Sequence, residues 1–202
     1  VPEKKISPMD VKYVLSSHYQ GTKYDCYGRH GDTSHQGQFR PIGIERTCFL
    51  SLHQNREEKQ KEVECITWLA FGSNAFNAMV PLFSSVDKIP AYFATTKKDV
   101  STDSFYWNNR LIAALTNASY LNSRFHVERY QNAVQSRAYQ LIEECKKEVT
   151  KKKRTTAEIK AMLEECNEKI ARIVRQETAD VLDKVLFEAS IVMKNSYSRS
   201  DA

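Results

Sequence analysis

Apolar residues recur at spacings of three and four through the second half of the chain. This period places them on one face of a helix, and it predicts helices over residues 104–120, 124–150 and from Thr155 to about 195. Thr155 and Glu158 have the spacing of a capping box at the start of the third helix. The last two helices, joined by a short basic link, are expected to pack as an antiparallel pair, and residues 196–202 are expected to fray.

The first hundred residues carry shorter apolar runs, together with all six glycines and all five prolines. Pro8 and Asp10 suit the start of a short helix. Residues 44–54 and 63–71 are rich in strand formers, and the polar connection between them predicts an antiparallel hairpin. Residues 80–83 and 91–94 fit either edge strands or lid-like segments packed on the core.

The order of these elements, strands first and helices later, favours the α+β class over alternating βαβ units. A chain of 202 residues is long enough for one domain with a sizeable core. We expect residues 1–202 to form a single domain or a fragment of one. Its parts are a strand-rich part (1–103), a helical part (104–195) and the frayed tail (196–202).

The composition, with 41% hydrophobic and 27% charged residues, is that of an ordinary folded protein. No segment approaches the roughly 20 apolar residues of a membrane span. Much of the formal net charge of +5 comes from Lys146, Lys147 and residues 151–154. Such a run is typical of a solvated helix end, so we expect neither a nucleic acid nor a membrane as a partner. No secretory signal pattern opens the chain, and its start at Val1 suggests the middle of a longer protein.

The five cysteines follow no metal-binding spacing, because no two are arranged as CxxC. We therefore expect no metal and no cofactor. Free thiols in a reducing compartment are the default for such a set, which favours a cytoplasmic location, although secretion with an unpaired cysteine stays open. Cys26 alone lies in a polar stretch and is the cysteine to check for reactivity, whereas the other four are expected to pack.

Residues 20–43 form a polar, glycine-rich stretch that is too long for a simple turn. Its donors and titratable groups suit a substrate pocket, and the candidates for substrate binding are Tyr24, Asp25, Asp32 and His35. A loop that only connects elements fits equally well. His30 and His35 are also candidate general bases, although a histidine in a loop is more often simply solvated.

Two further polar residues flank the predicted strands. Arg40 precedes the first strand, where a guanidinium can orient a carboxylate or stabilise an oxyanion through two hydrogen bonds. It can equally be a structural partner of Asp32 or Glu45. Asn74 follows the second strand, where its amide can bind substrate or, more commonly, cap the next turn.

Four segments follow one another in a recognisable order: SPMDVKYVLSSHYQGTKYDCYG, FRPIGIERT, WLAFGSNAFNAMVPLFSSVDKIPAYF and SFYWNNRLIAALTN. Together they cover about residues 7–120, and they resemble the bacterial dipeptidase A family, whose relatives include the animal secernins. The resemblance implies the C-terminal portion of an N-terminal-nucleophile hydrolase with an αββα sandwich, ending in long antiparallel helices. It also implies a supporting catalytic role for Arg40.

The nucleophile of that family is a cysteine at the mature N-terminus, which supplies the thiolate and, through its own amine, the base. This chain begins with Val1, so the resemblance implies part of a cysteine dipeptidase whose nucleophile is absent, and the chain alone is predicted to be inactive. The implied partners are a dipeptide substrate and the N-terminal remainder of the same protein, with a homo-oligomer also compatible. The alternative is a non-catalytic binding or scaffold protein that retains the hydrolase shell.

Overall fold

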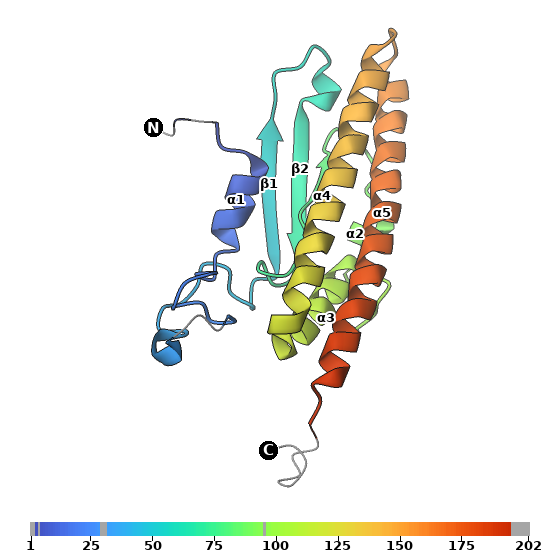
Figure 1. The fold of residues 1–202 in the computed structure, drawn as a ribbon. Helices are drawn as coiled ribbons and strands as arrows, with labels where there is room; N and C mark the ends of the chain where they lie inside the picture. Colours follow the sequence, from blue (N-terminus) through green and yellow to red (C-terminus); the bar gives the residue numbers. More distant parts are fainter. Residues whose placement is uncertain (1–2, 4, 29–31, 95, 195–202) are drawn as a thin grey trace.

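A three-stranded antiparallel sheet lies against two long helices in the computed structural model, which describes residues 3, 5–28, 32–94 and 96–194 (Figure 1). Strands β1 (Phe49–Asn55) and β2 (Cys65–Phe71) form the predicted hairpin. Strand β3 (Val80–Phe83) pairs with the other side of β2, which gives the order β1-β2-β3. The predictions of an antiparallel hairpin and of the α+β class are confirmed.

The helices lie close to where the apolar periodicity predicts them. They are α1 (Pro8–Leu15), α2 (Ala91–Ala94), α3 (Phe105–Ala118), α4 (Tyr120–Thr150) and α5 (Thr156–Ile191), with short 3₁₀ turns at Thr33–His35 and Lys61–Val63. The capping box of Thr155 and Glu158 is confirmed. Residues 91–94 form one helical turn packed on the core, and α4 begins earlier than predicted, directly after Ser119. The predicted tail, 196–202, lies outside the described residues.

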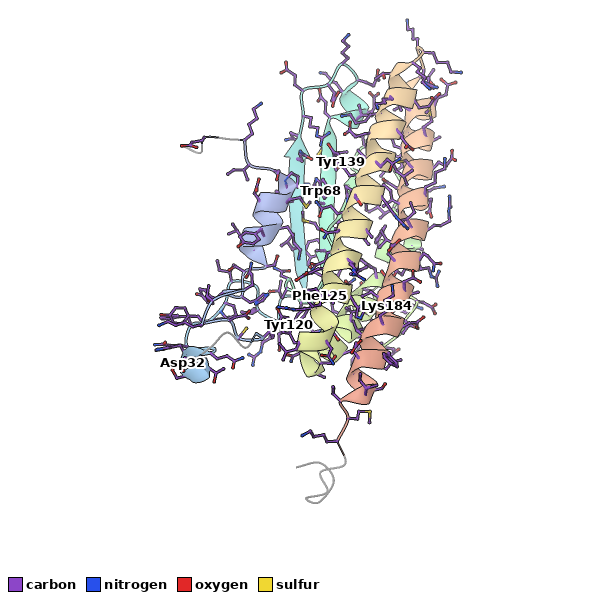
Figure 2. All side chains as sticks on the ribbon, in the orientation of Figure 1. Asp32, Trp68, Tyr120, Phe125, Tyr139 and Lys184 are labelled. Carbon is purple, nitrogen blue, oxygen red and sulfur yellow. The ribbon has the colours of Figure 1, made fainter. Side chains whose placement is uncertain are left out.

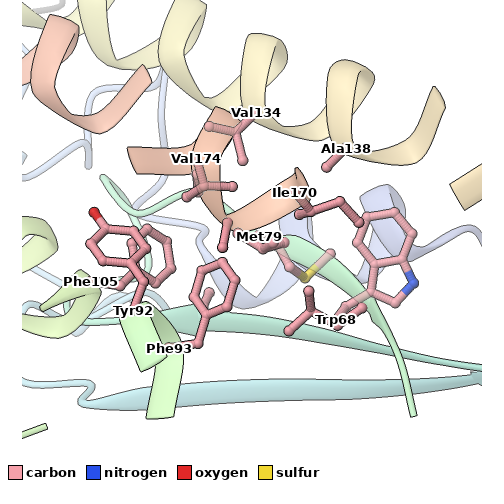
Figure 3. Close-up of a cluster of buried hydrophobic side chains, with 14 of the residues drawn as sticks. Trp68, Met79, Tyr92, Phe93, Phe105, Val134, Ala138, Ile170 and Val174 are labelled. Carbon is pink, nitrogen blue, oxygen red and sulfur yellow. The ribbon is translucent and has the colours of Figure 1, made fainter. Parts of the chain in front are cut away.

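One face of the sheet is buried beneath α4 and α5, which run side by side (Figure 1). Along β2, Ile66, Trp68 and Ala70 alternate toward this interface and are almost fully buried. Figure 3 shows Val134 of α4 and Ile170 of α5 in the same cluster of buried side chains. Burying one such side chain contributes about 1.5–3 kcal/mol, so this interface is the main source of stability. None of the helices in the described ranges combines the length and apolarity that crossing a bilayer requires.

The edge of β3 that faces away from β2 is closed by Asn167 of α5. Its Oδ1 accepts a hydrogen bond from the Phe83 backbone N–H at 3.0 Å, and its Nδ2 donates to the Phe83 carbonyl at 3.1 Å. Asn167 is only 1% exposed. A buried backbone group without a partner is costly, so this single side chain satisfies two groups that would otherwise destabilise the fold.

We expect Asn167→Leu to lower the free energy of unfolding by roughly 2–5 kcal/mol, because two buried backbone groups lose their partners together. Urea unfolding of the parent and the variant measures the difference. The matched control is Glu168→Leu, an exposed neighbour on the same helix that should change stability by no more than about 0.5 kcal/mol. Equal effects of the two substitutions would contradict the proposed role of Asn167.

Candidate active site

A hollow of about 570 Å³ opens between α1, the turn after β2 and the first half of α4. Segments far apart in the sequence contribute its polar lining, which includes Lys12, His18, Tyr120, Arg124, Glu128 and Gln131. Figure 2 shows Tyr120 at the start of α4, and its ring contacts that of His18, 6.1 Å away between centroids. A concave site with convergent polar groups is the usual place for a small ligand to bind.

Lys12 is the titratable residue of this hollow whose pKa is furthest from its ordinary value. Its Nζ donates hydrogen bonds to the backbone carbonyl of Asn74 and to Oδ1 of Asn77. Burial lowers the pKa of Lys12 to about 7, because desolvation disfavours the charged ammonium. A neutral amine has two N–H donors for these two acceptors and one lone pair. Lys12 can therefore accept a proton near neutral pH.

Asn74 and Asn77 join α1 to the end of β2. Nδ2 of Asn74 donates to the Leu15 carbonyl at 3.2 Å, at the last residue of α1, and Nδ2 of Asn77 donates to the Phe71 carbonyl at 3.0 Å. Both asparagines are buried. The observed contact of Asn74 is thus a cap, on α1 rather than on the following turn. Its predicted contact with substrate stays a prediction.

His18 and Asp25 form a buried pair at one side of the hollow. His18 Nδ1 lies 2.9 Å from Asp25 Oδ1, and the Tyr27 backbone N–H donates to the same oxygen at 3.0 Å. Burial opposes ionisation of Asp25, but the hydrogen bonds from Tyr27 and His18 outweigh it and lower the pKa of this carboxyl. Asp25 is therefore a buried carboxylate that orients the His18 imidazole, and its predicted contact with substrate is untested.

Cys26 completes a cluster with this pair. One ligand atom from each of His18, Asp25 and Cys26 lies within 4.8 Å of the others. Burial and the neighbouring Asp25 carboxylate raise the pKa of the Cys26 thiol, so it is protonated at neutral pH. Imidazole nitrogen, carboxylate oxygen and thiolate sulfur are also the ligand types of zinc sites, which makes these three residues the described candidates for holding a metal. The expectation of no metal and no cofactor stays a prediction.

Three of the other predicted substrate-binding residues lie in the loop after α1. The rings of Tyr24 and His35 are 5.8 Å apart, and Phe39 packs on Tyr24 at 5.0 Å, so the structure brings these side chains into one aromatic cluster. Asp32 accepts a hydrogen bond from the Ser34 backbone N–H at 2.9 Å and caps a 3₁₀ turn. Figure 2 shows Asp32 at the far end of the loop, away from α4.

Arg40 is exposed and lines a second hollow, of about 560 Å³, together with Cys26, Tyr27 and Glu45. Across the described ranges, no hydrogen bond or ion pair links Arg40 to Asp32 or to Glu45, so the structural pairing considered for it is not observed. The structure therefore separates the predicted residues into four groups: Arg40, Tyr24 with His35, Asp32 at the 3₁₀ turn, and the two residues near the first hollow, Asp25 and Asn74. The predicted catalytic role of Arg40 is untested.

Arg124 is a residue of the first hollow that sequence patterns alone do not single out. Its Nε is buried and has no hydrogen-bond partner among the residues that the structure describes. Its guanidinium lies 4.5 Å from the centre of the Phe125 ring, and Glu128 follows one turn later on α4. A guanidinium in the wall of a hollow, with an N–H group that has no acceptor, is suited to bind a carboxylate.

Comparisons with known proteins match this chain over most of its length. The model for the family described as Peptidase family C69 matches residues 1–133. A probable dipeptidase A of Streptococcus pyogenes serotype M3 (strain SSI-1) is 42% identical over 200 residues, which cover 99% of this chain and 42% of that protein. A dipeptidase of Bifidobacterium longum (strain NCC 2705) is 34% identical over 236 residues, covering 99% of this chain and 44% of that protein. The chain thus spans about two fifths of the length of these relatives.

The lowered pKa of Lys12 predicts a dependence of stability on pH. Between about pH 7 and pH 10 the unfolded chain binds a proton at Lys12 that the folded chain does not, so the free energy of unfolding should rise with pH in this window. We expect Lys12→Met to remove this part of the rise. Urea unfolding at several pH values measures it, with the exposed Lys59→Met as control. The same slope in parent and Lys12→Met would refute the assignment.

Proposed function

This chain belongs to peptidase family C69, and from that premise we propose that it forms part of an enzyme that hydrolyses dipeptides. The first hollow is its substrate site. The fold is one sheet and one helical layer of an αββα sandwich of the N-terminal-nucleophile type. In support of this, α4 and α5 cover one face of the sheet in the described part of the chain. The relatives are named as dipeptidases, and none of those names favours a non-catalytic scaffold.

The observation that carries the proposal is the charge pattern on α4. A dipeptide is a zwitterion, with a carboxylate at one end and an ammonium group at the other. Arg124 offers a guanidinium whose Nε has no acceptor among the described residues, and Glu128 offers a carboxylate four residues later on the same helix. Such positions are roughly 5–6 Å apart between Cβ atoms, and two extended residues span at most about 7 Å. The two side chains therefore match both ends of a dipeptide.

The reaction needs a thiolate, and the described cysteines do not offer one beside a base. The pKa of Cys26 is raised, and Cys145 and Cys166 line a separate hollow between α4 and α5 and do not line the first one. We therefore assign the nucleophile to a cysteine outside this chain, as in an N-terminal-nucleophile hydrolase. Its thiolate would attack the peptide carbonyl and release the C-terminal amino acid, and water would then hydrolyse the acyl-enzyme. Lys12 would hold or release a proton at the edge of the site.

We expect the Arg124→Gln substitution, made in the recombinant protein of natural length, to raise KM for dipeptides roughly 10- to 100-fold. The reason is that a hydrogen bond to a charged group contributes about 1.5–3 kcal/mol. Steady-state kinetics measures this value. Arg129→Gln is the matched control, since Arg129 is exposed on the same helix and does not line the hollow. A dipeptide amide, which lacks the carboxylate, should show little dependence on Arg124. An equal loss for free dipeptide and amide would exclude carboxylate binding by Arg124.

Cys26→Ser in the same protein should keep kcat/KM for dipeptides within about threefold of the parent, and the 202-residue chain alone should release no amino acid from dipeptides. The reason is that the protonated Cys26 thiol is a poor nucleophile. Chromatographic separation and quantification of the released amino acids measures both. Loss of activity on Cys26→Ser, with unchanged thermal unfolding, would identify Cys26 as the nucleophile and overturn the assignment to a cysteine elsewhere.

A further inference from the structure

Two cysteines meet between the long helices, in a hollow separate from the proposed substrate site. Cys145 lies on α4 and Cys166 on α5. The Cys145 Sγ reaches the carbonyl of Met162 at 3.9 Å, and the Cys166 Sγ reaches the carbonyl of Leu141 at 3.6 Å. Each thiol therefore lies over the opposite helix, four residues before the other cysteine. This reciprocal arrangement places the two thiols close to each other in the helix pair, and both line the same hollow.

The pair is accessible to a small molecule from one side. Both cysteines line a hollow of about 490 Å³ between α4 and α5. Its charged lining is balanced, with three lysines and three glutamates, and Lys151 pairs with Glu148 and Lys169 with Glu165. Cys166 is only 4% exposed, whereas Cys145 is partly exposed. A small reagent that enters this hollow would therefore reach the Cys145 sulfur before the Cys166 sulfur.

The two thiols also differ in reactivity. The neighbouring Cys166 thiol and the Lys169 charge lower the pKa of Cys145, and they outweigh the opposite effects of burial and of Glu165. The neighbouring Cys145 thiol and burial raise the pKa of Cys166. Cys145 therefore forms a thiolate more readily, whereas Cys166 stays protonated and is less exposed. Exchange reactions divide the attacking and the resolving roles between two cysteines in this way.

We propose that Cys145 and Cys166 form a thiol–disulfide exchange site that takes a low-molecular-weight disulfide such as oxidised glutathione. The Cys145 thiolate attacks one sulfur of the reagent, forms a mixed disulfide and expels one glutathione thiolate. The Cys166 thiolate then attacks the Cys145 sulfur, forms the intramolecular disulfide and expels the second glutathione thiolate. The two protein thiols lose one proton each, and both protons end on the two glutathione molecules. The cysteine pair is oxidised by two electrons, and the reagent is reduced by two.

The product is a covalent tie between α4 and α5, the two helices that cover the sheet. A disulfide between Cys145 and Cys166 closes the segment between them into a loop and restricts the unfolded chain. The oxidised protein should therefore melt roughly 5–10 °C higher than the reduced protein. The site operates on the helix pair alone and does not depend on the dipeptidase proposal.

The test exposes the reduced, folded protein in its natural length to oxidised glutathione and follows intact mass and tryptic peptides. We expect a loss of about 2 Da and a peptide linking Cys145 to Cys166, whereas a trapped mixed disulfide would add about 305 Da. Thermal unfolding of the oxidised product measures the rise in Tm.

Three serine variants separate the steps. Cys166→Ser should stop at the mixed disulfide on Cys145, and Cys145→Ser should leave Cys166 unmodified. Cys48→Ser, at an exposed cysteine before β1, is the matched control and should still form the linked peptide. The parent protein carries no substitution that could disturb its fold. If it gained glutathione at Cys48 or Cys65 but formed no link between Cys145 and Cys166, the proposal would be overturned.

Discussion

The burial of one sheet face beneath α4 is the constraint on which the rest of the structure depends, because this helix serves the core and the candidate site together. Val127, Tyr130 and Val134 face the core, and they are at most 3% exposed. Arg124 and Glu128 lie on the adjacent side and line the hollow. A helix fixed over its whole length by apolar packing cannot rotate without exposing that stripe, so the position of the two charged side chains follows from the core.

The opposite wall of the hollow is held by partial apolar packing together with polar contacts. Helix α1 has no fully buried residue, but Met9 and Leu15 pack partly against the core, and Lys12 attaches the helix to the asparagines after β2. The loop that follows it is closed at its base, where the Gly43 backbone N–H donates to the Ser17 carbonyl at 2.9 Å. A Cβ at Gly43 would lie 2.5 Å from the Ser16 carbonyl oxygen, so only glycine permits this approach. One wall is thus rigid through packing, and the other is sensitive to proton binding and to sequence.

Local patterns predict much of this fold, because caps and periodicity are properties of neighbouring residues. The capping box at Thr155 and the hairpin of β1 and β2 are examples. The site is less accessible to such reasoning. Asp25 is recognisable as a polar residue in a polar loop, but its contact with His18 depends on how that loop closes. Lys12 and Arg124 are 112 positions apart in the sequence. Both are residue types that usually lie on the surface, so neither is recognisable as a site residue before folding places both in one hollow.

The cluster of His18, Asp25 and Cys26 has the residue types of a catalytic triad but a different electrostatic arrangement. In a working triad the imidazole stands between the carboxylate and the nucleophile, so the carboxylate stabilises the imidazolium without approaching the developing thiolate. Here the carboxylate oxygen and the sulfur both lie within 4.8 Å of each other and of one imidazole nitrogen. The Asp25 charge therefore opposes ionisation of Cys26 directly. Three groups that converge on one point can share a proton or a cation, whereas a thiolate nucleophile needs its carboxylate on the far side of the histidine.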